Sequence, residues 1–366
     1  GGRHPETGRT DWTPVFTGAT IDRHAGGGRH PETGRTDWTP VFTGVTIDRH
    51  AGGGRHPETG RTDWTPVFTG VTLHFTNRGF RNMTKHRLNV KLVSLTLVLL
   101  GCMTLSVNAA GPMVQPGTTQ KIAEGVYVIP DQRVNLVPNI GIIVGNDAVM
   151  VVDTGMGPKN AETVLAEVRK ITDQPIRYLA ITHFHPEHGM GAQSFPKETQ
   201  VVVPRAQKEE LAEKGAQYIE LFKGFSPDIA ALLADVKLVT PHLAFDKSME
   251  IDLGGRTVQL LYLHPGHTRG DMFVYLPKEK ILFGGDLIID RFYPILPDGD
   301  ASPSGWVDSL NELKQLAPAI IVPGHGAVGD VRLMDALLAY FADVKSRVGK
   351  LRADGKTLEA VTVQLQ

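Results

Sequence analysis

One short segment brings three histidines and one glutamate together within six positions, in the order His183-Phe-His-Pro-Glu-His. In an extended segment alternate side chains share a face, so His183, His185 and Glu187 can point the same way. His188 then follows at a turn that Pro186 helps to fix, because proline locks φ and lacks an N–H. Neutral imidazoles bind metals such as zinc, and a carboxylate suits a harder metal position nearby. The segment therefore predicts a metal site, with a chance cluster in a polar loop as the alternative.

Two further histidines lie in glycine turns that follow apolar runs. His267 stands in Pro-Gly-His-Thr after the run 258–263, and His325 stands in Pro-Gly-His-Gly after the run 319–322. Between them in sequence, an apolar run ends in two glycines and Asp286. An α/β scaffold displays polar ligands on loops at strand ends, where glycine allows tight backbone geometry. These three residues are therefore candidates for the same site.

The order of the motifs HxHxEH, GHT, GGD and PGHG resembles the metallo-β-lactamase-fold hydrolase superfamily, over roughly residues 121–350. Asp153, in Val-Val-Asp-Thr-Gly, matches that family's early strand-end aspartate. The resemblance implies a seven-residue metal set. A first metal would be held by His183, His185 and His267, and a second by Glu187, His188 and His325, with Asp286 bridging the two.

The chain departs from the family pattern at Glu187, where aspartate is usual. The extra methylene of glutamate must move either the carboxylate or the metal, so we expect a displaced or weaker second site. In the alternative, Glu187 only hydrogen-bonds a metal-bound water. Asp153 also has two interpretations, a hydrogen bond that orients a metal ligand or a role in shaping the Asp-Thr-Gly turn. Both are favoured over direct ligation.

The implied cofactor is Zn2+, expected as two ions, with iron or manganese as alternatives. A zinc site with an open position lowers the pKa of bound water towards roughly 7. The expected reaction is hydrolysis of a small ester, thioester, lactone or lactam, with Glu187 and Asp286 as the catalytic carboxylates. Asp286 favours a glyoxalase-II-like or lactonase-like centre, because the true β-lactamases place cysteine or serine there. The alternatives are a periplasmic β-lactamase-like enzyme, an iron-dependent oxidoreductase of the same fold, and a non-catalytic binding module.

The beginning of the chain is a tandem repeat with a period of 26 residues. Residues 1–26 return as residues 27–52 with one change, from Ala19 to Val45, and a third copy fades after Thr72. The repeat is rich in Gly, Arg, Thr, Asp and Pro and lacks a pattern that could build a core. We therefore expect residues 1–82 to be disordered and to represent translated upstream sequence.

Met83 opens a segment typical of a bacterial secretory signal peptide. Basic residues at 85–91 precede an apolar stretch at 92–100 and small residues at 107–110, and the apolar stretch is too short and interrupted for a membrane span. Residues 83–110 are therefore predicted to be a signal peptide, and the protein to be periplasmic or secreted. Cys102, the one cysteine, resembles a lipoprotein box, so the alternative is a lipoprotein that meets the membrane only if lipidated at Cys102.

The remaining residues, 111–366, suit one large α/β domain. Strand patterns occur at 122–129, 140–144, 148–152, 178–182 and 200–203, then between 237 and 283 and again up to 322. Helical periodicity occurs at 160–171, 205–214, 228–234, 306–316 and 331–350. The pattern alone indicates the α/β class. The resemblance implies an αββα sandwich in a single domain, with the metals at one edge between the sheets.

Charge and the other polar residues narrow the function further. A net charge of −1 gives no excess of positive charge that would attract nucleic acid, so we expect a small-molecule substrate and no nucleic-acid partner.

The segments 290–294 and 224–227 are candidates to line or cover the substrate site, with ordinary surface loops as the alternative. We expect His264 to pack or hydrogen-bond rather than bind metal, and His242 to be a loop residue. We expect Asp271 to be structural or to support a metal ligand, and not to be catalytic. The sequence leaves the oligomeric state open.

Overall fold

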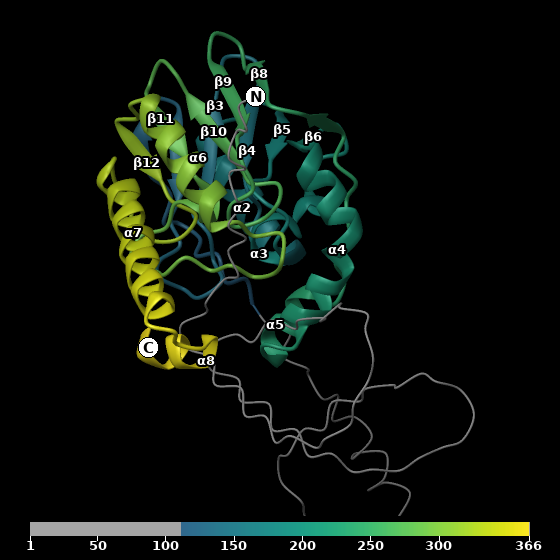
Figure 1. The fold of residues 1–366 in the computed structure, drawn as a ribbon. Helices are drawn as coiled ribbons and strands as arrows, with labels where there is room; N and C mark the ends of the chain where they lie inside the picture. Colours follow the sequence, from purple (N-terminus) through teal and green to yellow (C-terminus); the bar gives the residue numbers. More distant parts are fainter. Residues whose placement is uncertain (1–110, 366) are drawn as a thin grey trace, which may run out of the picture. The chain divides into compact units, whose positions relative to one another are not determined.

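The computed structural model describes residues 111–365, in which two β-sheets lie face to face and helices cover their outer faces (Figure 1). The expectations for residues 1–82 and for the signal peptide at 83–110, including Cys102, lie outside the described residues. Within residues 111–365, no helix combines the length and the apolar character needed to cross a bilayer.

The first sheet has the strand order β1-β2-β3-β4-β5-β6-β7. Neighbouring strands run antiparallel from β1 to β4 and parallel from β4 to β7. Its strands are Gln120–Ala123, Val126–Ile129, Ile140–Val144, Val149–Val152, Ile176–Ala180, Gln200–Pro204 and Leu243–Phe245. The single strand predicted at 122–129 is wrong, because Gly125 adopts a φ of 68° and turns the chain into the β1–β2 hairpin.

The second sheet has the order β12-β11-β10-β9-β8. Its strands are Ser248–Asp252, Thr257–Tyr262, Met272–Leu276, Ile281–Phe283 and Ile320–Val322, for β8 to β12. Strand β10 is antiparallel to both β9 and β11, and β11 is parallel to β12. The carboxyl ends of β9, β11 and β12 therefore lie at one edge of the sheet. In the first sheet, the parallel pairing of β4 and β5 likewise places their carboxyl ends together.

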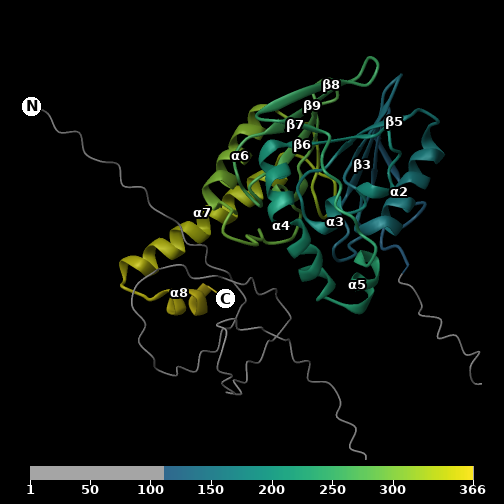
Figure 2. The ribbon, with the colours of Figure 1, turned by 90° about the vertical axis from the view of Figure 1, so that its right-hand side faces the viewer.

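Alternation along the strands divides the core into layers. On β4, Met150 and Val152 pack between the two sheets, whereas Val149 and Val151 pack against α2, because successive side chains of a strand point to opposite faces. In the second sheet, Phe273 and Leu282 face α6 and α7 in the same way. Figure 2 shows α2 on one side of the paired sheets and α6 and α7 on the other. The expected α/β class and αββα sandwich are confirmed.

The helices agree with the predicted positions but differ in length. They are α2 (Gly157–Ile171), α3 (Pro186–Gly189), α4 (Arg205–Lys223), α5 (Pro227–Leu233), α6 (Pro303–Gln315), α7 (Arg332–Ala353) and α8 (Leu358–Leu365), with 3-10 turns η1 (Ala192–Ser194) and η2 (Gly285–Leu287). The sequence analysis did not predict α3 or α8.

Candidate metal centre

Three imidazoles meet where the two sheets share an edge. His183 and His185 follow β5, and His267 lies between β9 and β10. The Nδ1 atom of His185 is 3.0 Å from Nε2 of His183 and 3.1 Å from Nε2 of His267. A tetrahedral zinc ion with bonds of about 2.0–2.1 Å needs ligand nitrogens roughly 3.3 Å apart. The spacing of these nitrogens is therefore close to that of a metal-ligand set.

Hydrogen bonding alone does not account for this arrangement. All three histidines are buried, and burial lowers the pKa of each, well below its usual value for His183 and His185. They are therefore neutral, with one proton per ring. His267 directs its Nδ1 to the Ile295 carbonyl oxygen at 2.8 Å, which leaves the lone pair on Nε2 facing the other two rings. Neutral imidazoles converging in this way fit a metal ion.

A second donor group lies beside the first. Glu187 and His188 lie on α3, Asp286 lies on η2, and His325 follows β12. One potential ligand atom from each of the four lies within 4.8 Å of the others. The Asp286 Oδ1 atom is 3.3 Å from Nε2 of His188 and 3.5 Å from Nε2 of His325.

Several atoms of this second group are buried without a hydrogen-bond partner. Among residues 111–365, these include Oε2 of Glu187, Nε2 of His188 and Oδ1 of Asp286. Buried polar atoms in folded proteins are nearly always partnered. Nε2 of His188 and Oδ1 of Asp286 lie 3.3 Å apart without hydrogen-bond geometry, and Oε2 of Glu187 has no partner, an arrangement that suits a cation between them. The residues present therefore fit a second metal ion. Asp286 also directs Oδ2 towards Nε2 of His267, at 3.8 Å, and so stands between the two groups, as a bridging ligand would.

The charges of the second group are strongly coupled. Burial raises the pKa of Glu187 to about 7. Burial by itself would lower the pKa of His188, but Asp286 and Asp153 outweigh it and raise that pKa well above its usual value. For Asp286, the histidines around it outweigh burial and hold its pKa well below its usual value. Asp286 is therefore ionised, which suits a metal-binding carboxylate.

The predicted face of His183, His185 and Glu187 differs from the structure. The segment bends after β5, and helix α3 begins at Pro186. Proline is favoured in the first turn of a helix, so the segment turns before Glu187 instead of continuing as an extended chain. His183 and His185 consequently lie in the first group, and Glu187 lies with His188 in the second.

Asp153 orients the loop that carries the histidines. Its Oδ2 accepts hydrogen bonds from Nδ1 of His188 at 2.9 Å and from the Thr182 hydroxyl at 2.8 Å, and its Oδ1 accepts from the Thr182 N–H at 2.7 Å. Its φ of 65° is uncommon outside glycine. Such strained positions persist where the surrounding structure holds them. The contacts agree with the hydrogen-bonding interpretation of Asp153.

Replacing Asp153 with asparagine should weaken the second metal position. Asparagine tolerates a positive φ, so the backbone is retained, but the charge that holds His188 is lost. Loss of such a partner typically lowers metal affinity by about 10- to 100-fold, measurable by competition with a chelating dye. Asp173→Asn, at an exposed position after α2, is the matched control. Equal metal affinity in the two variants would show that Asp153 only shapes the turn and does not support metal binding.

The turn that carries His325 is held by residues far away in the sequence. Asn139 donates from Nδ2 to the carbonyl oxygens of Pro323 (2.9 Å) and Gly326 (2.8 Å). Asp131 accepts the Gly326 N–H at 2.8 Å, and His325 directs Nδ1 to the Val137 carbonyl at 2.9 Å. Sequence reasoning missed Asp131 and Asn139, because their partners lie 184 to 195 positions away and no local pattern marks them.

Two other side chains, those of Asp271 and Trp306, contact His267. Asp271 accepts the His267 N–H at 2.7 Å and also the N–H and hydroxyl of Thr268, which confirms its expected structural role. Trp306, which the sequence analysis did not single out, donates from Nε1 to the Leu287 carbonyl at 2.8 Å, and its ring lies 5.8 Å from that of His267.

The remaining two histidines of the domain stay out of both donor groups. His264 pairs with Glu312 at 2.8 Å, and His242 accepts the Val201 N–H at 3.0 Å. The expectations that His264 hydrogen-bonds and that His242 is a loop residue are therefore confirmed.

Gly324 leaves no room for a side chain beside Asp286. A Cβ atom at this position would lie 2.1 Å from Asp286 Oδ1 and 2.7 Å from the carbonyl carbon of Gly285. Gly324→Ala should therefore displace the carboxylate and lower kcat/KM by about 100-fold, since a misplacement of roughly 1 Å can have that effect. Gly349→Ala is the control, because nothing lies within 4 Å of its Cβ and alanine favours the helix. Steady-state kinetics would check this, and a fully active Gly324→Ala variant would contradict the position of Asp286.

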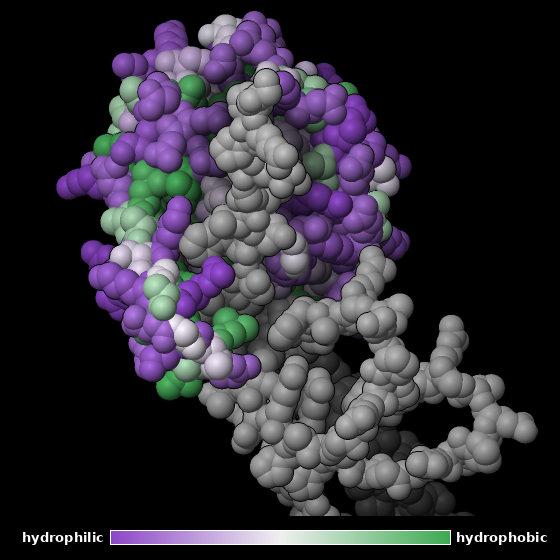
Figure 3. All heavy atoms as spheres, viewed as in Figure 1, coloured by the Kyte–Doolittle hydropathy of each residue, from purple (hydrophilic) through white to green (hydrophobic). Residues whose placement is uncertain are grey.

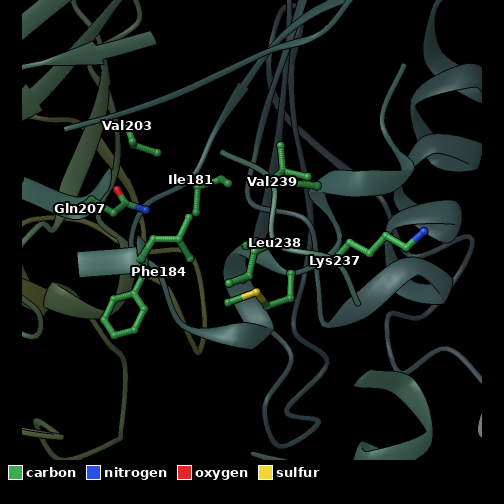
Figure 4. A pocket seen from close by; sticks show the side chains of 11 residues that line it. Ile181, Phe184, Val203, Gln207, Lys237, Leu238 and Val239 are labelled. Atoms are coloured by element: carbon green, nitrogen blue, oxygen red, sulfur yellow. The ribbon is translucent and has the colours of Figure 1, made fainter. Parts of the chain in front are cut away.

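A small apolar cavity lies behind the histidine loop. Ile181, Phe184, Leu238 and Val239 are among its lining residues, and the amine of Lys237 points away from it (Figure 4). Its volume of about 20 Å³ has room for about one water molecule. This cavity is therefore too small to hold a substrate.

Two candidate ligands are the more accessible members of the centre. The side chains of Asp286 and His325 are 12% and 14% exposed, whereas that of His188 is fully buried. Access to the donor groups is therefore from the side of Asp286 and His325. The predicted pocket segment 290–294 lies beside this opening, because the Phe292 ring is 6.0 Å from that of His325. The segment 224–227 instead joins α4 to α5, where Ser226 caps α5 and Phe225 packs against Phe222.

Comparison with known proteins gives a consistent family signal. A family model described as the metallo-beta-lactamase superfamily matches residues 134–325. A linear primary-alkylsulfatase of a Pseudomonas species is 28% identical over 213 residues, which cover 49% of this chain and 40% of that protein. A type 2 metallo-beta-lactamase of Bacteroides fragilis is 27% identical over 212 residues, 55% of this chain and 74% of that protein.

Two further similarities complete the comparison. An acyl-coenzyme A thioesterase of Bos taurus is 30% identical over 168 residues, 42% of this chain and 58% of that protein. The chain thus spans less than two thirds of the alkylsulfatase and of the thioesterase. Among solved structures, a metallo-beta-lactamase from Pontibacter korlensis has a TM-score of 0.49 and 24% identity, covering 61% of this chain and 98% of that one.

Proposed function

The chain belongs to the metallo-β-lactamase superfamily, and on that premise we propose that it is a metal-dependent hydrolase of small ester, thioester, lactone or lactam substrates. One observation carries the proposal, namely the meeting of two donor groups at one edge of the sandwich. The first comprises His183, His185 and His267, and the second comprises Glu187, His188, Asp286 and His325.

Each donor group suits one divalent ion, and Zn2+ matches imidazole nitrogens combined with carboxylate oxygens. Iron and manganese are the alternatives. Bound there, the two ions would supply a water of lowered pKa and would polarise the carbonyl oxygen of the substrate.

The protein's own residues orient the reacting groups. Asp286, ionised between the two groups, can accept a hydrogen bond from the attacking water and so aim it at the substrate. Glu187 offers a buried oxygen, Oε2, that has no hydrogen-bond partner among the described residues. This oxygen can serve as a ligand of the second ion or can carry a proton to the leaving group. The backbone contacts of His267 and His325 fix the tautomer of each ring, which keeps Nε2 free to act as a ligand.

The relatives support the reaction class more than the substrate. Their names describe hydrolysis of a sulfate ester, a thioester and a β-lactam, which share an attack by water but differ in the bond that is broken. Function on a common fold is decided by the site. We therefore propose the hydrolase class from the donor groups and leave the substrate to be found by assay.

The testing experiment measures the metal content of the purified protein and then its activity on a panel. The panel contains a lactam, a lactone, a thioester and a simple ester, each with and without a chelator. Zinc with chelator-sensitive hydrolysis is the expected result. Iron accompanied by oxygen consumption would favour an oxidoreductase, and full metal loading without turnover on the panel would favour a binding module. Cell fractionation would test the proposed periplasmic or secreted location.

A further inference from the structure

The loop that follows Asp286 is attached to the candidate metal centre at two points. The Asp290 N–H donates to the His325 carbonyl oxygen at 2.9 Å, and the Ile295 carbonyl oxygen is 2.8 Å from Nδ1 of His267. The chain between these anchors, residues 291–294, is therefore held at the rim of the centre.

This rim is apolar and exposed. Phe292 and Tyr293 are 46% and 45% exposed, and Ile295 is 38% exposed. Single exposed hydrophobic residues are ordinary, but neighbouring ones usually mark a binding site. The Phe292 ring also lies 6.0 Å from the ring of His325, so the apolar rim is continuous with the donor groups.

A groove separates this rim from α7. One wall is formed by Ile289, Asp290, Arg291, Phe292 and Pro294, and the other by Leu333, Ala336, Leu337 and Tyr340 of α7. On the face drawn in Figure 3, hydrophobic side chains gather over α6 and α7, in a surface that is otherwise mostly polar where it is visible. The groove has a volume of about 250 Å³, whereas pockets for whole drug-sized ligands have roughly 300–1,000 Å³. It is therefore suited to part of a ligand.

The charges beside the groove are few and mostly engaged. Asp290 pairs with Arg133 at 2.8 Å and accepts the Ala327 N–H at 3.2 Å. Arg291 also lines the groove, but its side chain is 82% exposed and its Nε lies 4.0 Å from Oδ1 of Asp290, so its charge is largely solvated. A sugar or a charged peptide would make few hydrogen bonds or ion pairs in this groove. A hydrocarbon chain would instead leave water and bury its surface against aliphatic and aromatic side chains.

We propose that this groove binds the aliphatic chain of an acyl ester or thioester whose scissile bond lies at the metal centre. The proposal rests on the proposed hydrolase function and names its substrate class. Phe292 carries the argument, because it is both a wall of the groove and a neighbour of His325.

The first test is a chain-length series of 4-nitrophenyl esters from acetate to decanoate. We expect kcat/KM to rise by up to about fourfold for each methylene that enters the groove. Ala336→Trp should fill the groove and flatten the series. Ala339→Trp is the matched control, because Ala339 is exposed on the same helix and does not line the groove. A steep series that survives in Ala336→Trp, or a flat series in the parent protein, would overturn the proposal.

The second test separates the groove from the proposed function. Binding of decanoate to the purified, metal-loaded protein, measured by calorimetry, should be weakened by Ala336→Trp and by Phe292→Ser but not by Ala339→Trp. Circular dichroism would establish that each variant is folded. Decanoate binding without any hydrolysis would refute the hydrolase function and leave the groove standing. Hydrolysis without decanoate binding would refute the groove proposal and leave the hydrolase function standing. Binding to phosphatidylglycerol vesicles but not to decanoate would also refute the proposal and would indicate that the surface binds a membrane.

Discussion

Turnover is expected to be abolished in a His185→Ala variant, while the protein stays folded. The Nδ1 atom of His185 is the one that faces both His183 and His267, at 3.0 Å and 3.1 Å. Its removal leaves two nitrogens where three converge. The loss in kcat/KM should therefore exceed the roughly 100-fold loss seen when a supporting residue is removed.

The structural cost of this change should be modest. The His185 ring stacks on Tyr218, with centroids 4.9 Å apart and an interplanar angle of 16°, so alanine loses that contact. It also removes a buried imidazole that contributes to the lowered pKa of His183. His264→Ala is the control, since His264 is half-exposed and pairs with Glu312 away from both groups of candidate ligands. Metal content and kinetics would be measured on both, and near-normal turnover in His185→Ala would refute the metal assignment.

Asp286→Asn is expected to lose one of two metal ions and most of the activity. The carboxylate directs one oxygen to His188 and His325 and the other towards His267, so it serves both groups. Asparagine keeps the shape but carries no charge, and its amide nitrogen cannot act as a ligand. Removal of one stabilising polar group from an active site typically lowers kcat by about 10²–10³-fold, and we expect at least this loss.

The measurement for Asp286→Asn is metal stoichiometry by mass spectrometry of the intact protein, together with kcat/KM. Asp308→Asn, at an exposed site on α6, controls for the loss of one negative charge. Retention of both ions with undiminished turnover would show that Asp286 does not join the two donor groups.

The sequence could single out the candidate ligands because each of them belongs to a local motif. The short spacing of His183, His185 and His188, and the glycine turns around His267 and His325, are visible without knowledge of the fold. The helical periodicity of α2 also identifies its buried face, whereas β4 is apolar and buried on both faces, so the sequence alone does not assign its side chains to layers. The pairing of the seven residues into two groups came from the family resemblance, and the structure brings the same residues together.

What the sequence did not predict depends on tertiary contacts. Asn139 and Trp306 meet their partners through the fold rather than through a motif. Helix α4 continues past the predicted end at Lys214, although Gly215 follows. That glycine is buried, and a Cβ there would lie 3.2 Å from Leu238, so packing outweighs its poor helix propensity.

Each donor group draws on both sheets, since every one combines residues that follow β5 with residues that follow strands of the second sheet. An ion bound there would be coordinated by residues from both sheets and would stabilise their packing. Its removal would therefore lower the stability of the folded domain as well as abolish hydrolysis. Because His325 comes so late in the chain, a growing polypeptide could not complete its second donor set until almost all of the domain had been synthesised.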